Sequence, residues 1–209
     1  MTFVYLVRHG QTAWNKSEIF RGRADVPLNE RGFKEAELAA EYFRGRKVDA
    51  IYASSMSRAI QTAERIAGVL GLKVLLHSGI TDMSFGDWEG RPIDEVESRD
   101  ADRFRLWQEA PHLLKVPGGE TLEEVRTRAI AALEEVIQTH AHGTVIMVSH
   151  RVVTKVLICA ILGLDNSHFW QIDQDTTAIN LVRYKNGKYA LCLMNETCHL
   201  KPLADRGMN

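Results

Sequence analysis

Near the start of the chain an apolar run at residues 3–7 ends on a cation, an imidazole and a glycine, Arg8, His9 and Gly10. Arginine offers a planar fork of donors that suits phosphate or carboxylate. Histidine can act as a nucleophile or general base near neutral pH, and glycine allows the backbone to approach a ligand closely. Three residues alone are a weak signal, because a strand that ends on two exposed polar residues is the commoner explanation of such a tripeptide.

Two later stretches have the same form. Ser54 and Ser55 follow a second apolar run, and Arg58 lies in the first turn of the helix expected next, where the helix dipole also favours an anion. A third apolar run ends on Ser149 and is followed by His150. Taken singly, a solvated arginine and a histidine that satisfies a helix start would explain these positions.

Alternating strand and helix patterns predict how these residues are positioned. Predicted strands cover residues 3–8, 48–53, 73–76 and 144–149, and predicted helices cover 29–44, 57–71, 101–109, 121–139 and 152–163. Asn-Gly between the runs 178–184 and 188–194 indicates a hairpin. We therefore expect one α/β domain over residues 1–209, a three-layer α/β/α fold whose central sheet is mostly parallel with an antiparallel hairpin. The carboxyl ends of its parallel strands would bring the three polar stretches to one edge.

The composition narrows the class of function. The 209 residues are 45% apolar and 25% charged with a formal net charge of -1, which argues against nucleic-acid or anionic membrane partners. The apolar stretch at 152–164 contains Lys155 and is too short to span a bilayer, and the run at 3–7 is too short for a signal peptide. Three cysteines without metal-type spacing indicate free thiols in a reducing cytoplasm. We expect a cytoplasmic monomer or homodimer that holds no metal.

The longer string Leu-Val-Arg-His-Gly-Gln-Thr-x-x-Asn, residues 6–15, resembles the signature of the histidine phosphatase superfamily, which includes the cofactor-dependent phosphoglycerate mutases. The resemblance implies that His9 accepts the phosphoryl group as phosphohistidine and that Asn15 donates to phosphate. Residues 54–62 and 148–150 resemble the second and last motifs of the family. They imply a phosphate-binding Arg58 and make His150 the second histidine. The family usually has glycine after that histidine, whereas Arg151 here would either add charge at the pocket or point outward.

The proton donor is the point where this chain departs from the family pattern. Residues 80–90 resemble Leu-x-Glu-x-x-Phe-Gly-x-Trp-Glu-Gly, and Asp82 stands at the place of the glutamate that protonates the leaving group. Asp87 and Glu89 are rival acids. The loop at 20–28 matches the substrate side of the family site, with Gly22 at the family's glycine.

Arg21 places a bulky cation on that loop. It could hold a substrate carboxylate in a bidentate pair, or form a salt bridge with Glu18 or Asp25.

The resemblance runs from residue 3 to about residue 199 and implies a metal-independent phosphatase that needs no cofactor and acts on small phosphorylated metabolites. Arg8, Arg58 and a protonated His150 would bind the dianion, and Asp82 would hold the proton for the leaving oxygen. A cofactor-dependent phosphoglycerate mutase is an alternative, disfavoured by the short segment between Asp82 and His150. The remaining alternative is a non-catalytic phosphate-binding domain on the same fold.

Overall fold

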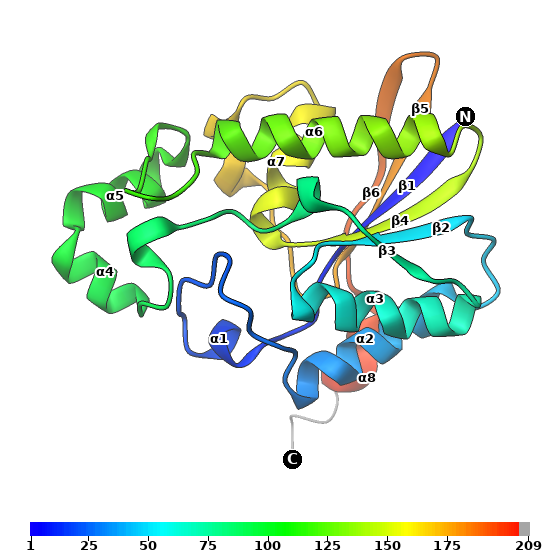
Figure 1. Ribbon diagram of the computed structural model, residues 1–209, viewed down its shortest axis with the longest axis horizontal. Coiled ribbons are helices and arrows are strands. Elements are labelled where there is room, and N and C mark those ends of the chain that lie inside the picture. Colours follow the sequence, from blue (N-terminus) through cyan, green and yellow to red (C-terminus); the bar gives the residue numbers. More distant parts are fainter. Residues whose placement is uncertain (205–209) are drawn as a thin grey trace.

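A six-stranded sheet forms the centre of the molecule, in a computed structural model that describes residues 1–204 (Figure 1). The predicted domain boundary at residue 209 lies outside the described residues. The strands occur in the order β3-β2-β4-β1-β5-β6. Their bounds are β1 Thr2–Arg8, β2 Ala50–Ala53, β3 Val74–Leu76, β4 Thr144–Ser149, β5 Ile179–Lys185 and β6 Lys188–Glu196.

The sheet has the predicted mixture of strand directions. Strands β1, β2, β3 and β4 pair in parallel, whereas β5 pairs antiparallel with both β1 and β6. The β5–β6 hairpin turns at Asn186 and Gly187, both of which have positive φ, as a tight hairpin turn requires. The predicted three-layer, mostly parallel fold with an antiparallel hairpin is therefore confirmed.

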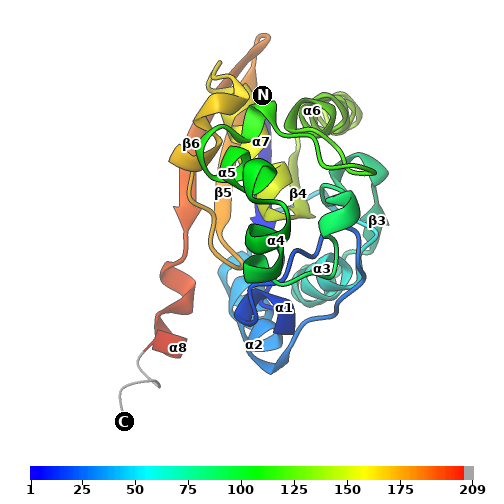
Figure 2. The same cartoon turned by 90° about the vertical axis from the view of Figure 1, so that its left-hand side faces the viewer.

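Helices cover both faces of the sheet (Figures 1 and 2). Alternate residues of β1 and β4 face opposite sides, so that Leu6 and Met147 pack with helices α6 and α7, while Val7 and Val148 pack with α2 and α3. The helices are α1 Ala13–Lys16, α2 Glu30–Phe43, α3 Ser57–Leu70, α4 Ile93–Arg99, α5 Ala101–Glu109, α6 Leu122–Thr139, α7 Arg151–Ile161 and α8 Lys201–Ala204.

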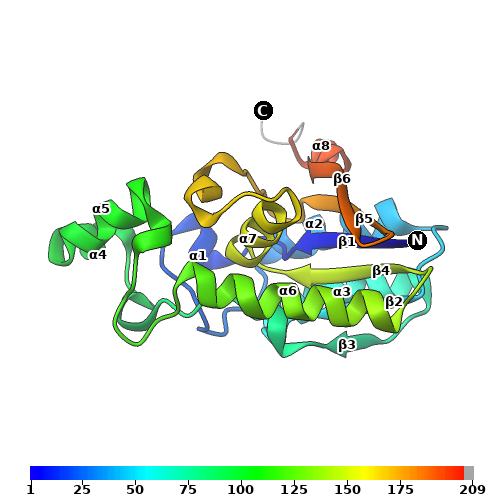
Figure 3. The ribbon, with the colours of Figure 1, turned by 90° about the horizontal axis from the view of Figure 1, so that it is seen from above.

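Helices α4 and α5 extend beyond the end of the sheet at which β1 and β4 terminate (Figure 3). Residues of this projecting pair face a pocket over that end of the sheet, and Phe104 and Trp107 fix the pair to the main core. In the described part of the chain, no helix is both long and apolar enough to cross a membrane.

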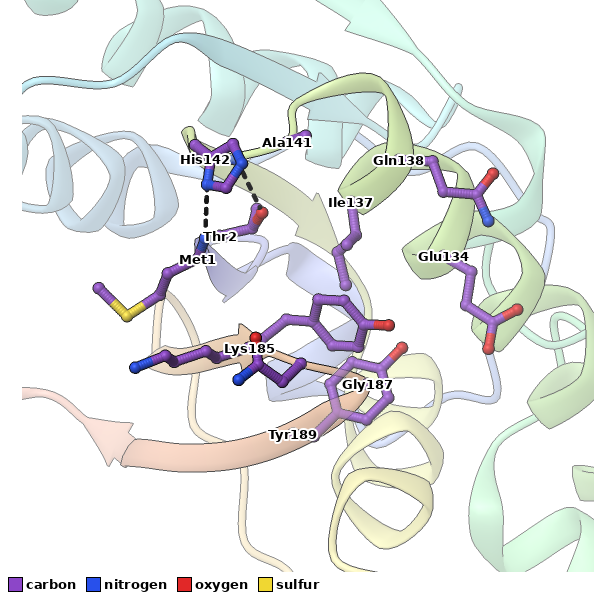
Figure 4. A pocket seen from close by; sticks show the side chains of 12 residues that line it. Met1, Thr2, Glu134, Ile137, Gln138, Ala141, His142, Lys185, Gly187 and Tyr189 are labelled. Carbon is purple, nitrogen blue, oxygen red and sulfur yellow. Dashed lines mark hydrogen bonds between the residues drawn. The ribbon is translucent and has the colours of Figure 1, made fainter.

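A hollow of about 540 Å³, larger than the pocket beside α4 and α5, lies at the other end of the sheet, where β1 begins and the β5–β6 hairpin turns (Figure 4). Its polar groups are partly paired with one another, since the Met1 amino group lies 2.8 Å from His142 Nδ1. Tyr184 and Tyr189 pack together on the same wall, with ring centroids 4.9 Å apart. The chemistry-bearing residues of the sequence motifs lie at the opposite end, near the projecting helices.

Candidate active site

The parallel pairing of β1 with β4 brings two of the predicted polar stretches together. Arg8 is in register with Ser149, and the His9 backbone N–H donates to the Ser149 carbonyl at 2.9 Å. The rings of His9 and His150, which are 141 positions apart in sequence, consequently have centroids 5.2 Å apart. The expected convergence at the carboxyl ends of the strands is present.

His9 is fully buried as a neutral imidazole with a defined tautomer. Its Nδ1 lies 2.7 Å from the Gly10 carbonyl oxygen. Because a carbonyl can only accept, Nδ1 carries the proton and Nε2 keeps its lone pair. Burial, reinforced by Arg58, His150 and Arg8, holds the pKa of His9 well below its usual value. Among residues 1–204, Nε2 of His9 has no hydrogen-bond partner, so its lone pair is not engaged.

Two helices fix the loop that carries His9. The Gly10 N–H donates to Thr62 Oγ1 of α3 at 3.0 Å, and the Gln11 N–H donates to the buried carboxylate of Glu35 in α2 at 2.8 Å. Gly10 also lies so close to α2 that a β-carbon on it would come within 2.6 Å of the Gly32 carbonyl oxygen. The sequence motifs did not identify Glu35, because its partner is 24 positions away and its spacing only indicates a helix.

Asn15 of α1 lies at the wall of the pocket with its amide orientation set by a neighbour. Its Oδ1 accepts from the Thr12 N–H at 2.9 Å and from Thr12 Oγ1 at 3.0 Å. The NH₂ group of Asn15 is therefore the part of the amide left for a ligand in the pocket.

Arg58 is fully buried at the centre of the site. Its Nη2 donates to Asp82 Oδ2 at 3.0 Å, and its Nε donates to His150 Nδ1 at 3.3 Å. The same guanidinium also holds the pocket loop, donating to the carbonyls of Gly22 at 2.8 Å and Ala24 at 2.9 Å. Gly22 has a positive φ, and a β-carbon there would collide with the Glu89 carboxylate. Glycine is thus required where the loop passes over the acid segment.

Asp82 and His150 form a buried pair in which both pKa values are shifted. Burial favours the neutral carboxyl of Asp82, but His150, Arg58 and Arg21 outweigh it and lower the pKa of Asp82. Burial lowers the pKa of His150 to about 3, despite an Asp82 oxygen 3.4 Å from Nδ1. Both shifts favour an ionised Asp82 and a neutral His150 in the ligand-free protein, whereas the protonated His150 expected from the sequence belongs to the complex with a phosphate dianion.

Asp82 is the acid that faces the pocket, and its rivals do not. Asp87 is exposed outside the pocket lining. The Glu89 carboxylate accepts from the backbone N–H groups of Arg23 and Phe85 and from Ser84 Oγ, so that it serves to shape the loop.

Arg128 of α6 holds the acid segment in place. Its guanidinium donates to the carbonyl oxygens of Gly79, Thr81 and Asp82 at 2.9, 2.6 and 3.1 Å. Glu120 completes the arrangement, because its carboxylate accepts from Arg128 Nε at 2.9 Å and from the Ser84 N–H at 2.9 Å. No motif in the sequence indicated Arg128, since it contacts the segment from 46 positions away.

The pocket itself is small and strongly cationic. Its volume is about 160 Å³, and Arg21 and Arg151 line it beside Asp82. Burial and neighbouring arginines lower the pKa of Arg8 to about 9 and that of Arg21 to about 10, so both stay protonated at neutral pH. Arg8 donates one bond to the Gln174 carbonyl, and the buried Nε atoms of Arg8 and Arg21 have no partner in the described chain. This excess of cations over carboxylates favours an anionic ligand.

The described residues contain no group of His, Cys, Asp or Glu side chains arranged to hold a metal ion. The positively charged side chains that line the pocket are those of Arg21 and Arg151.

A fold and a site of this kind define a histidine phosphatase, and comparison with known proteins agrees. The model of the histidine phosphatase superfamily (branch 1) matches residues 4–197. The chain belongs to this superfamily, and the predicted class of phosphoric monoester hydrolase is confirmed.

Relatives with the same architecture cover nearly the whole chain. Phosphoserine phosphatase 1 of Hydrogenobacter thermophilus is 36% identical over 200 residues, which are 96% of this chain and 95% of the relative. YhfR of Bacillus stearothermophilus has a TM-score of 0.93 at 30% identity, covering 96% and 100% of the two chains. A mutant phosphoserine phosphatase from Entamoeba histolytica, solved with phosphoserine, has a TM-score of 0.86 at 26% identity, with coverage of 96% and 100%.

Proposed function

We propose that this protein is a metal-independent phosphatase that hydrolyses small phosphomonoesters through a phosphohistidine on His9. The observation that carries the proposal is the state of His9, a buried neutral imidazole whose Nδ1–H is held by a carbonyl and whose Nε2 is free. Such an imidazole is a ready nucleophile, and the surrounding arginines supply the charge that a phosphoryl group requires.

In the proposed first step, Nε2 of His9 attacks phosphorus and the bond to the leaving oxygen breaks. The Nδ1–H···O bond to Gly10 keeps the ring oriented, while Arg8, Arg58 and the Asn15 amide hold the non-bridging oxygens. The leaving oxygen takes a proton from Asp82. Because Arg58 holds Asp82 ionised in the empty site, a dianion that binds Arg58 offsets the arginine charge and raises the pKa of Asp82 in the required direction.

In the second step, water attacks the phosphorus of the phosphohistidine and passes its proton to Asp82. The P–N bond breaks and returns the neutral imidazole. His150 would gain a proton beside the bound dianion, although burial keeps it neutral in the empty site.

Trapping of the intermediate tests the proposal. Brief reaction with a labelled phosphomonoester should give an acid-labile phosphoryl group on the wild type and none on His9→Ala, which should also lose turnover while staying folded. Label on His150 instead would reverse the roles of the two histidines. Isomerisation of phosphoglycerate primed by bisphosphoglycerate, with little free phosphate released, would move the assignment to a mutase.

We further propose that the substrate tail carries a carboxylate. Arg21 and Arg151 lie in the pocket lining, and neither forms an ion pair with a carboxylate in the described chain. The alternative partner Asp25 is engaged elsewhere, accepting from the Ser57 N–H at 2.7 Å and from Ser57 Oγ at 2.6 Å. One charge-assisted pair is worth about 1.5–3 kcal/mol, or roughly 10- to 150-fold.

Phosphoserine and phosphoethanolamine differ only in a carboxylate and so test the tail. Arg21→Ala should lower kcat/KM for phosphoserine selectively, by roughly 10- to 150-fold. An equal fall for both substrates, or none, would remove the carboxylate from the proposal and leave the hydrolytic reaction standing.

A further inference from the structure

The guanidinium of Arg151 is held in the pocket wall by an aromatic ring instead of a carboxylate. Its Cζ lies 5.8 Å from the centroid of the Trp170 ring, within the range of a cation–π contact. Burial lowers the pKa of Arg151, and Asp82 is the acid that acts against this shift. A carboxylate partner would occupy the N–H donors of Arg151, whereas a ring face attracts the cation and leaves those donors to a ligand.

Trp170 is itself fixed on two sides. Its Nε1–H donates to the Trp107 carbonyl of α5 at 2.6 Å, and the two indole rings pack edge to face with centroids 5.1 Å apart. Trp107 lines the same pocket as Arg151. The Trp170 indole therefore contacts both helix α5 and the Arg151 guanidinium.

A second cation of α7 also uses this aromatic surface. Lys155, one turn after Arg151, has its Nζ 4.4 Å from the Trp170 centroid and 4.8 Å from that of Phe169. Both α7 cations next to the pocket thus rest on aromatic rings, which do not neutralise them. Neither cation forms an ion pair with a carboxylate within the described residues, and Asp82 and Asp173 act on Arg151 and Lys155 only through their charge from farther away.

We propose that Trp170 is a positioning residue for substrate selectivity, because its indole holds Arg151 with free donors toward the carboxylate of the tail. This inference rests on the proposed phosphatase function and its carboxylate-bearing substrate. Because Trp170 acts through Arg151, its replacement should change the preference for substrates with a carboxylate over substrates without one. The phosphoryl transfer itself, which other residues carry out, should be unaffected.

The test is the ratio of kcat/KM for phosphoserine to that for phosphoethanolamine. Trp170→Leu should lower this ratio by about two- to fivefold, mainly through KM, the size expected for one exposed cation–π contact. Trp170→Phe keeps a ring face and should restore most of the preference. Leu162→Ala is a matched control, since Leu162 is an exposed apolar residue directly after α7, 47% accessible against 36% for Trp170.

A double-mutant cycle separates positioning from a general structural role. In the Arg151→Ala background, Trp170→Leu should have no further effect on the ratio. The inference is overturned by an equal fall for both substrates, by an unchanged ratio, or by the same effect with and without Arg151. An active wild type without preference for phosphoserine also overturns it. A wild type that hydrolyses neither substrate overturns the proposed function, and this inference with it.

Discussion

Asp82 stands at the place where the family pattern has glutamate, yet it is the carboxylate that contacts Arg58 and His150. Its shorter side chain still lies 3.0 Å from Arg58 and 3.4 Å from His150. Asp82→Asn should lower the rate on alkyl phosphates by roughly 10²–10⁴-fold, the usual contribution of general acid catalysis. Nitrophenyl phosphate, whose leaving group needs little protonation, should be affected less in the phosphorylation step. Steady-state rates on the two substrates measure the difference.

Asp87→Asn is the matched control. Asp87 is exposed on the same segment, and its substitution removes the same charge as Asp82→Asn. It should leave both rates near those of the wild type. If Asp87→Asn or Glu89→Gln were severe and Asp82→Asn harmless, another carboxylate would be the proton donor.

Residue identities at the site were predictable from sequence, but protonation states were not. Each of these side chains, Arg8, His9, Arg58 and His150, ends or follows a predicted strand or lies in the first turn of a predicted helix, so their convergence follows from the parallel sheet alone. The pKa of His150 depends instead on burial and on Asp82, Arg58 and Arg21, which come from three distant segments. The combined effect of burial and of charges from distant segments cannot be read from the spacing of residues in the sequence.

At the scale of elements, α6 positions the acid through Arg128. Arg128→Leu removes three donors to the carbonyls of the acid segment and leaves the Glu120 carboxylate without this partner. We expect a lower kcat on alkyl phosphates and a smaller loss on nitrophenyl phosphate, because the effect passes through Asp82. Steady-state kinetics on both substrates, with the melting temperature as a check of folding, measure this.

Arg126→Leu is the matched control for Arg128. Arg126 lies on the same helix but donates to the Leu164 carbonyl, away from the acid segment. Its replacement should not distinguish the two substrates. Equal losses on both substrates in Arg128→Leu would mean that Arg128 supports the fold in general.

The long helices were predicted because their apolar spacing is periodic, whereas the short helices α1 and α4 were missed. Helix α4 went unpredicted, since only Val96 of its seven residues is buried and the rest give no periodic signal. Helix α1 is a single turn within the signature motif. The strand predicted from residue 48 begins at Ala50, because Asp49 turns its carboxylate back to the Thr144 N–H at 2.8 Å.

At the scale of the whole molecule, the two buried histidines should make stability depend on pH. The pKa of His9 and that of His150 are both lowered by burial, so below about pH 6.5 the unfolded chain binds more protons than the folded one. The free energy of unfolding should therefore fall as the pH falls, by about 1.4 kcal/mol per pH unit for each histidine. Asp82, whose pKa is also lowered, adds a further loss at more acidic pH.

Chemical denaturation at pH 7, 6 and 5 measures this slope. His150→Gln should reduce it by about one proton, and His112→Gln, at an exposed position, should leave it unchanged. An identical slope in wild type and His150→Gln would show that His150 does not remain neutral in the folded state.

The lowered pKa of Asp82 in the empty pocket determines where the proton for the leaving group comes from. Because the pKa values of His9, His150 and Asp82 are all lowered, the free enzyme at neutral pH has no acidic proton on these three groups for the departing alcohol. The proton must therefore be taken up when the substrate binds, either with the monoanion of the phosphate ester or from solvent by Asp82 beside the bound dianion. The second pKa of such esters is about 6, so kcat/KM on alkyl phosphates should decline about tenfold per pH unit above it. A flat profile from pH 6 to 8 would mean that the resting enzyme stores the proton itself.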